Sequence, residues 1–120
     1  MSRLFCGIDI GTTNLKVLLL DESGETLWVK SVPAPHLRDE LGVVTDAPAL
    51  VTVSEDLIIE GWRTVAKGRV ISAISTGGIG EDGVGVDSSL APLGHAIQWN
   101  DRRGETYSHA LSQTTHAQNY

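Results

Sequence analysis

The chain has 120 residues, of which 41% are hydrophobic and 20% are charged, and its formal net charge is −6. This length predicts one domain with a single core. No apolar run reaches the length of a membrane span, and the first residues lack the apolar stretch of a secretory signal. Nucleic-acid binding is not expected, because phosphate backbones are bound by clustered Lys and Arg, and the sequence has no such cluster. We therefore expect a globular domain located in the cytoplasm.

Cysteine usage agrees with this expectation. Cys6 is the single cysteine, so an intrachain disulfide and a cysteine-rich zinc site are both excluded. We expect Cys6 to be a small buried residue in a strand.

The first third of the chain predicts three antiparallel strands. Residues 4–10 and 15–20 are apolar, and residues 25–32 alternate between apolar and polar side chains. Tight turns that contain glycine separate these segments, which is typical of a meander. Residues 33–45 contain two prolines and several polar side chains, and we expect a surface loop there.

A helix is predicted to follow this loop. Asp46 can accept a hydrogen bond at the helix start, Pro48 fits the first turn, and Gly68 favours the end. Apolar residues recur at helical spacing at Leu50, Val53, Leu57, Ile58, Trp62 and Val65. The β-branched residues 51–53 weaken the first turns, so a helix that begins at Ser54 is the alternative.

Residues 69–76 then predict a strand, which makes the element order β-β-β-α-β. A glycine-rich loop is expected at residues 77–83, and residues 84–86 and 95–97 are expected to pair as a hairpin. From residue 104 onward the sequence is polar and predicts at most one or two helical turns.

The strongest local motif runs from Asp9 to Lys16. It places a carboxylate at the end of a strand, a glycine, two threonines and Asn14 in a turn, and a lysine on the next strand. Main-chain N–H groups in such a turn can bind an anion, and the hydroxyl groups add donors. Asp9 could hold a hydrated Mg²⁺, and Lys16 could neutralise phosphate charge. An ordinary hairpin turn is the alternative.

This motif, D-x-G-T-T-x-x-K after a first strand, resembles the first phosphate-binding segment of the actin-like ATPase superfamily. That resemblance implies an α/β domain of the ribonuclease H-like type with a mixed sheet, which this chain contains only in part. It also implies that the turn holds the β- and γ-phosphates of ATP.

The second glycine loop offers a hypothesis from another class. Gly78, Gly80 and Gly83 match the fingerprint of dinucleotide-binding oxidoreductases, and Asp101 follows about twenty residues later. That fingerprint requires a helix after its third glycine, whereas the residues after Gly83 alternate as a strand does. In this loop the adjacent Glu81 and Asp82 could accept hydrogen bonds from hydroxyl groups. A solvated loop acid is the alternative, and we favour it for Asp82.

A third motif combines an aromatic ring with charges. Trp99 can stack on the C–H face of a sugar, while Asp101 and the Arg103 guanidinium can bind hydroxyl groups. A structural tryptophan with surface ion pairs is the alternative. The Asp9–Lys16 turn, the strand with its glycine loop, the hairpin and W-x-D-x-R occur in an order that resembles the N-terminal part of the FGGY carbohydrate kinases.

The FGGY resemblance implies transfer of a phosphoryl group from ATP, with Mg²⁺, to a hydroxyl of a sugar or polyol. Asp9 would lie near Mg²⁺, and the phosphates would contact Gly11, Thr12, Thr13, Asn14 and Lys16. The sugar would contact Gly80, Glu81, Trp99, Asp101 and Arg103. Glycerol-type members have Arg-Glu where this chain has Gly80-Glu81, which disfavours glycerol. Xylulose-type members have Met-His there, although their Trp-Asn-Asp-x-Arg matches well.

The same resemblance implies that residues 1–103 are the N-terminal part of the first kinase domain and that residues 104–120 lead into its remainder. FGGY kinases are much longer than this chain, and their general base lies beyond the residues present here. We therefore expect no catalytic base in this chain and no turnover by it alone. An incomplete sheet would expose a strand edge, which also allows a homodimer. A non-kinase actin-like ATPase that acts as a nucleotide switch is the alternative function.

Overall fold

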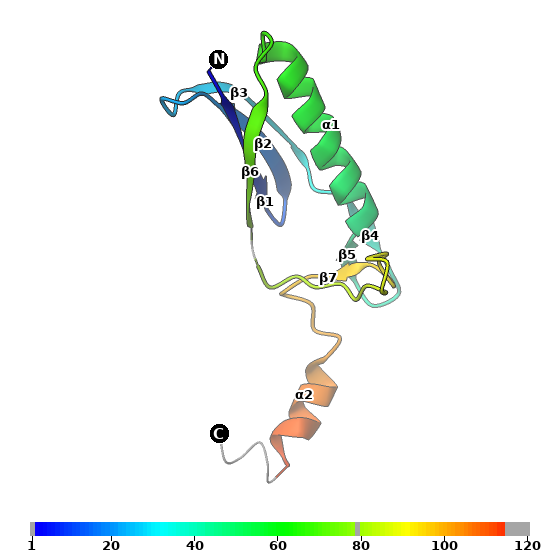
Figure 1. The fold of residues 1–120 in the computed structure, drawn as a ribbon. Coiled ribbons are helices and arrows are strands. Elements are labelled where there is room, and N and C mark those ends of the chain that lie inside the picture. Colours follow the sequence, from blue (N-terminus) through cyan, green and yellow to red (C-terminus); the bar gives the residue numbers. More distant parts are fainter. Residues whose placement is uncertain (1, 79, 115–120) are drawn as a thin grey trace.

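The computed structural model describes residues 2–78 and 80–114, which form two sheets and two helices (Figure 1). The larger sheet has the order β3-β2-β1-β6, from β1 (Leu4–Ile10), β2 (Asn14–Leu20), β3 (Thr26–Pro33) and β6 (Ile71–Gly78). The smaller sheet has the order β4-β5-β7, from β4 (His36–Arg38), β5 (Val43–Thr45) and β7 (Ala96–Ile97). The helices are α1 (Ala47–Val65) and α2 (Glu105–Ser112).

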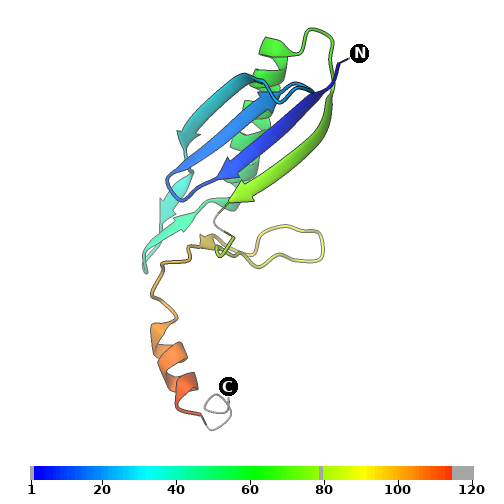
Figure 2. The ribbon, with the colours of Figure 1, turned by 90° about the vertical axis from the view of Figure 1, so that its left-hand side faces the viewer.

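The larger sheet confirms the predicted meander and its mixed character. β2 pairs antiparallel with β1 and β3, whereas β6 pairs parallel with β1. α1 lies across one face of this sheet (Figure 2). The buried core between sheet and helix consists of Cys6, Leu15, Val17, Leu19 and Leu57. Cys6 is buried in a strand as predicted, and burial raises the pKa of its thiol.

The predicted start and end of α1 are both confirmed. The Asp46 side chain accepts a hydrogen bond from the N–H of Ala49 at 3.1 Å, and Pro48 lies in the first turn. The helix is continuous over 19 residues, so the alternative that it begins at Ser54 is wrong. The cap and the burial of the helix face outweigh the weak propensity of its β-branched residues. Beyond the helix, Gly68 has a φ of 85°, a left-handed conformation that glycine adopts readily.

The prediction of a surface loop at residues 33–45 is wrong, because β4 and β5 form a hairpin there. Val44 is almost fully buried, and its strand also pairs with β7, more than fifty residues later in the chain. Strands of three residues carry too little alternation to be seen in a sequence, and here the pairing partner is distant.

Two boundaries near the glycine loop also differ from the prediction. β6 continues to Gly78, because Gly77 and Gly78 pair with Asp9 and Ile10 of β1. The two segments of the expected hairpin do face each other, through bridges between Gly83 and Ile97 and between residues 86 and 92. Residues 84–86 form no strand, however, and the ladder partner of β7 is β5.

The C-terminal part leaves the compact region. α2 projects away from the sheets and has no buried residue, which agrees with the prediction of one or two turns (Figure 1). β6 is an edge strand of the described sheet, so the expected exposed edge is present. No helix among the described residues is long and apolar enough to cross a membrane.

Candidate functional site

The turn between β1 and β2 is closed by its own main chain. The N–H of Gly11 donates to the carbonyl oxygen of Asn14 at 2.9 Å, and a Cβ at Gly11 would lie 2.8 Å from that same oxygen. Only glycine therefore fits this position without a shift of the turn. On the other side, the N–H of Ala34 donates to the carbonyl of Thr13 at 2.9 Å, which anchors the turn to the segment after β3.

The same turn leaves several donors available. Within residues 2–78 and 80–114, the main-chain N–H groups and the hydroxyls of Thr12 and Thr13 donate to no other protein group. Two N–H groups and two hydroxyls in consecutive residues form a cradle of the kind that binds phosphate oxygens. The turn therefore has donors that a ligand could use, and phosphate binding by these residues stays a prediction.

Asp9 and Lys16 flank this turn as cross-strand partners on β1 and β2. Both are exposed and lie on the sheet face opposite α1, because their chain neighbours Ile10 and Val17 pack in the core beneath the helix. In the described ranges neither side chain forms an ion pair with the protein. A single accessible carboxylate fits a hydrated Mg²⁺, which takes one or two carboxylates and otherwise water and phosphate oxygens.

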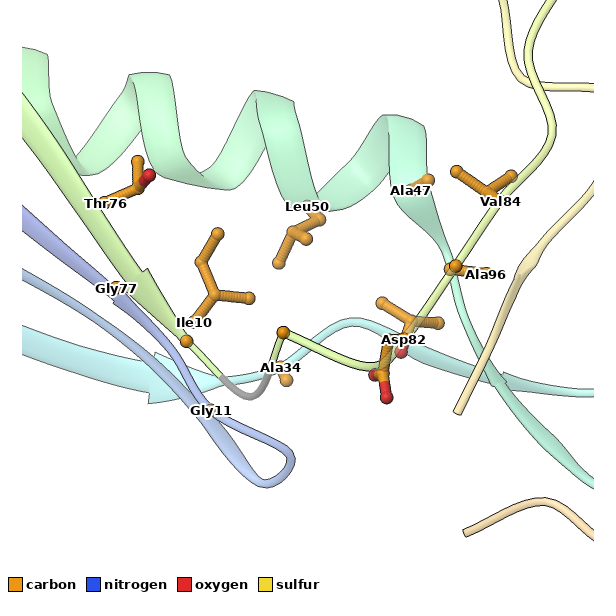
Figure 3. Close-up of a pocket in the computed structure, with 14 residues that line it drawn as sticks. Ile10, Gly11, Ala34, Ala47, Leu50, Thr76, Gly77, Asp82, Val84 and Ala96 are labelled. Atoms are coloured by element: carbon orange, nitrogen blue, oxygen red, sulfur yellow. The ribbon is translucent and has the colours of Figure 1, made fainter. Parts of the chain in front are cut away.

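Two hollows meet at the turn. The first, which we call the apolar hollow, has a volume of about 380 Å³ and lies between the ends of β1 and β6 and the first turn of α1 (Figure 3). Ile10 and Leu50 point into it, and Gly80, Asp82 and Val84 border it.

The second, which we call the polar hollow, has a volume of about 720 Å³ and is bordered by Thr12, Thr13, Asn100 and Asp101. The turn therefore contributes Gly11 to one hollow and its two threonines to the other. In this way the structure brings the predicted phosphate-binding residues next to two of the predicted sugar-binding residues, Gly80 and Asp101. Glu81, Trp99 and Arg103 border neither hollow.

Asp101 and Arg103 bind each other. The Arg103 guanidinium donates to both oxygens of Asp101, from Nε at 2.8 Å and from Nη2 at 2.9 Å. It also donates to both oxygens of Asp39 in the β4–β5 turn, at 2.8 and 3.3 Å. Because most of the donors of Arg103 are used in this way, the guanidinium links the β4–β5 hairpin to the W-x-D-x-R segment.

The contacts among Asp39, Asp101 and Arg103 shift the pKa of all three side chains. Hydrogen bonds from Arg103, followed by those from the N–H groups of Leu41 and Gly42, lower the pKa of Asp39 to about 2. The pKa of Asp101 is also lowered, first by the side chain and then by the main chain of Arg103. The two carboxylates raise the pKa of Arg103 in turn. All three groups are therefore charged at neutral pH.

The remaining predicted sugar-binding residues are Gly80, Glu81 and Trp99. Trp99 is 55% exposed, and Gly80 has a φ of 80°, in the left-handed region. Glu81 is exposed, whereas the adjacent Asp82 accepts a hydrogen bond from the N–H of Trp99 at 2.8 Å. Asp82 is exposed, as predicted for a solvated loop acid, and it also makes this one contact with the main chain of Trp99.

The oxidoreductase hypothesis from the sequence can now be judged. The assignment of a dinucleotide-binding site to this loop is wrong, because no helix begins after Gly83 among the described residues until α2 at Glu105.

Sequence analysis missed Asp39. Its spacing to Gly42 is typical of a turn, and that signal could have identified the β4–β5 hairpin, although not the contact with Arg103.

The family is decided by a comparison with family models. Residues 4–120 match the model described as the FGGY family of carbohydrate kinases, N-terminal domain. The chain belongs to the FGGY family. This membership confirms the resemblance seen in the motifs.

Individual FGGY kinases show the same relationship. Gluconokinase of Bacillus subtilis strain 168 is 26% identical over 116 residues, which cover 94% of this chain and 22% of that protein. Xylulose kinase of Lactococcus lactis is 30% identical over 99 residues, covering 81% of this chain and 20% of that one. A crystal structure of gluconate kinase from Lactobacillus acidophilus superposes with a TM-score of 0.84 at 22% identity, covering 99% and 24%. The chain thus spans about a quarter of the length of its FGGY relatives.

Proposed function

We propose that this chain forms part of an FGGY kinase that transfers the γ-phosphoryl group of ATP to a hydroxyl of a sugar or polyol. The observation that carries the proposal is the β1–β2 turn, whose glycine cannot be replaced without strain and whose Thr12 and Thr13 keep their donors available. In phosphoryl transfer, catalysis depends mainly on positioning and on neutralising charge at the phosphates. A rigid turn with free donors is suited to both tasks.

On the phosphate side, Gly11, Thr12, Thr13 and Asn14 are proposed to bind the β- and γ-phosphates, and Lys16 to offset their charge. Asp9 is proposed to hold Mg²⁺ through water. A bound Mg²⁺ would supply positive charge at the phosphate oxygens.

On the acceptor side, Gly80, Glu81 and Trp99 are proposed to contact the sugar. Asp101 and Arg103 are also proposed to contact the sugar, as a pair that orders this segment, because the Arg103 guanidinium donates to both oxygens of Asp101. We propose that the general base lies in a part of the kinase outside these 120 residues. The names of the relatives make gluconate and xylulose the first acceptors to test.

We further propose that residues 1–103 belong to the first kinase domain and that residues 104–120 lead into its remainder. A cytoplasmic location and the absence of nucleic-acid or membrane partners are proposed from the composition and the metabolic role of the family. Pairing of two copies into a homodimer is proposed through exposed surface such as the edge of β6.

The phosphate turn can be tested by replacing Thr12 and Thr13 together with alanine in the full-length protein. We expect kcat/KM to fall by roughly a hundredfold or more, because donors to a developing negative charge are typically worth that much. The measurement is ADP release with a panel of sugars, polyols and aldonates. Ser23→Ala in the β2–β3 turn of the same sheet is the matched control and should leave kcat/KM unchanged. Full activity of the double variant, or no acceptor-dependent ADP release by the unmodified protein, would contradict the proposal.

A further inference from the structure

The three tryptophans differ in what holds their rings. Trp28 packs against the core, and the indole N–H of Trp62 donates to the carbonyl of Arg69 at 3.0 Å. Trp99 is 55% exposed, and among the described residues its indole N–H has no hydrogen-bond partner. Within the described residues no hydrogen bond of the indole fixes the Trp99 ring, so the placement of its main chain helps to set where the ring lies.

That main chain is tied to the second glycine loop. The carboxylate of Asp82 accepts a hydrogen bond from the N–H of Trp99 at 2.8 Å, although the two residues are 17 positions apart. Next to this bond, Gly83 and Ile97 exchange two main-chain hydrogen bonds at 2.9 and 3.1 Å. Of the hydrogen bonds that the structure describes between residues 82–83 and residues 97–99, the one from Asp82 uses a side chain, and those between Gly83 and Ile97 use the main chain alone.

The loop around Asp82 is rich in glycine, so a hydrogen bond that orders it is important. Gly80, Gly83 and Gly85 surround Asp82, and glycine loses more conformational entropy on ordering than any other residue. Asp82 also borders the apolar hollow, opposite Ile10 (Figure 3). Asp82 therefore lies in the glycine loop, borders the apolar hollow and binds the main chain of Trp99.

We propose that Asp82 is a positioning residue for the sugar acceptor. This inference rests on the proposed function, in which Trp99 contacts the sugar. The Asp82 carboxylate holds the Trp99 main chain beside residues 80–83, so that the ring is already oriented when an acceptor arrives. Ordering the ring in advance removes an entropy cost from acceptor binding.

The proposal is tested by Asp82→Ala and Asp82→Asn in the full-length protein. Asp82→Ala should raise the KM for the acceptor about tenfold, because misplaced binding groups weaken the productive complex, while the KM for ATP stays within about twofold. Asp82→Asn should stay within about threefold of the unmodified protein, since a carboxamide oxygen still accepts from the Trp99 N–H.

Asp87→Ala is the matched control. Asp87 lies in the same segment and accepts hydrogen bonds from Ser89 and Ala91, and within the described ranges it forms no hydrogen bond with Trp99. This variant should leave the acceptor KM unchanged. An equal rise in Asp82→Ala and Asp87→Ala, an Asp82→Asn variant as impaired as Asp82→Ala, or an equal rise in both KM values would overturn the proposal.

A second measurement does not depend on activity. With 5-fluorotryptophan incorporated, the ¹⁹F resonance of Trp99 is assigned by its loss in Trp99→Phe. Asp82→Ala should shift or broaden this resonance, and Asp87→Ala should not. An unchanged Trp99 resonance in Asp82→Ala would overturn the positioning role. If the unmodified protein phosphorylates no acceptor, the proposed function fails, while the ¹⁹F spectra still decide whether Asp82 orders Trp99.

Discussion

Asp39 illustrates how one side chain joins two parts of the site. It lies in the β4–β5 turn, where its carboxylate accepts from the N–H groups of Leu41 and Gly42 at 2.9 and 2.8 Å. The same carboxylate binds Arg103, which in turn holds Asp101. The space is tight, since a Cβ at Gly42 would come within 3.3 Å of an Asp101 oxygen. These contacts make Asp39 a structural support for the W-x-D-x-R segment.

The lowered pKa of Asp39 predicts a pH dependence of stability. Its pKa is about 2 in the folded protein, below the ordinary value near 4, so its ionised form favours folding. The contribution is complete above about pH 4 and is lost as the pH falls from about 4 toward 2. Asp39→Asn should therefore lower Tm at pH 6 and flatten the decline of Tm over that acidic interval. The test is thermal unfolding as a function of pH, and an unchanged slope in the variant would refute this role.

At the scale of elements, α1 is docked on the sheet through a close approach at Gly61. Gly61 is buried on the helix, and a Cβ there would lie 2.6 Å from Cε3 of Trp28 on β3. The helix is also fastened by an ion pair between Lys30 of β3 and Glu60 of α1 at 2.8 Å. Both contacts tie α1 to β3, at the side of the sheet away from β6.

Gly61→Ala tests this packing. Alanine favours a helix over glycine by about 1 kcal/mol, whereas overpacking a core costs about 1–3 kcal/mol. We expect the second effect to win, so that the free energy of unfolding falls by up to about 2 kcal/mol. Gly77→Ala in β6 is the control, because a Cβ there meets nothing within 4 Å. Unfolding in denaturant measures both, and a stabilised Gly61→Ala variant would show that the contact is looser than described.

The whole molecule is extended for its length. Its radius of gyration is 18.8 Å, compared with about 14 Å for a compact domain of this size. Tyr107 and Leu111 on α2 are 80% and 65% exposed, and Ile74 on the edge strand β6 is 54% exposed. Apolar side chains at such positions indicate surfaces that are normally covered, which agrees with a chain that spans about a quarter of its relatives.

These 120 residues alone should not catalyse phosphoryl transfer. The phosphate contacts proposed for them lie on one side only, whereas the reaction needs positioning and charge neutralisation around the whole transferring group. A coupled assay on residues 1–120 with ATP and a sugar panel should show no ADP above background, with the full-length protein as the positive control. Clear turnover by the 120 residues would mean that the base and the nucleotide contacts are already present here.

Local sequence determined the parts of this protein that depend on neighbouring residues. The meander, the glycine turn at Gly11 and the start of α1 at Asp46 follow from side-chain alternation, turn chemistry and capping, which act over a few positions. Tertiary structure alone decided that β5 pairs with β7, that Asp39 binds Arg103 and that Asp82 holds Trp99. Each of these contacts joins residues 17 to 64 positions apart, so their partners become neighbours only when the sheets assemble.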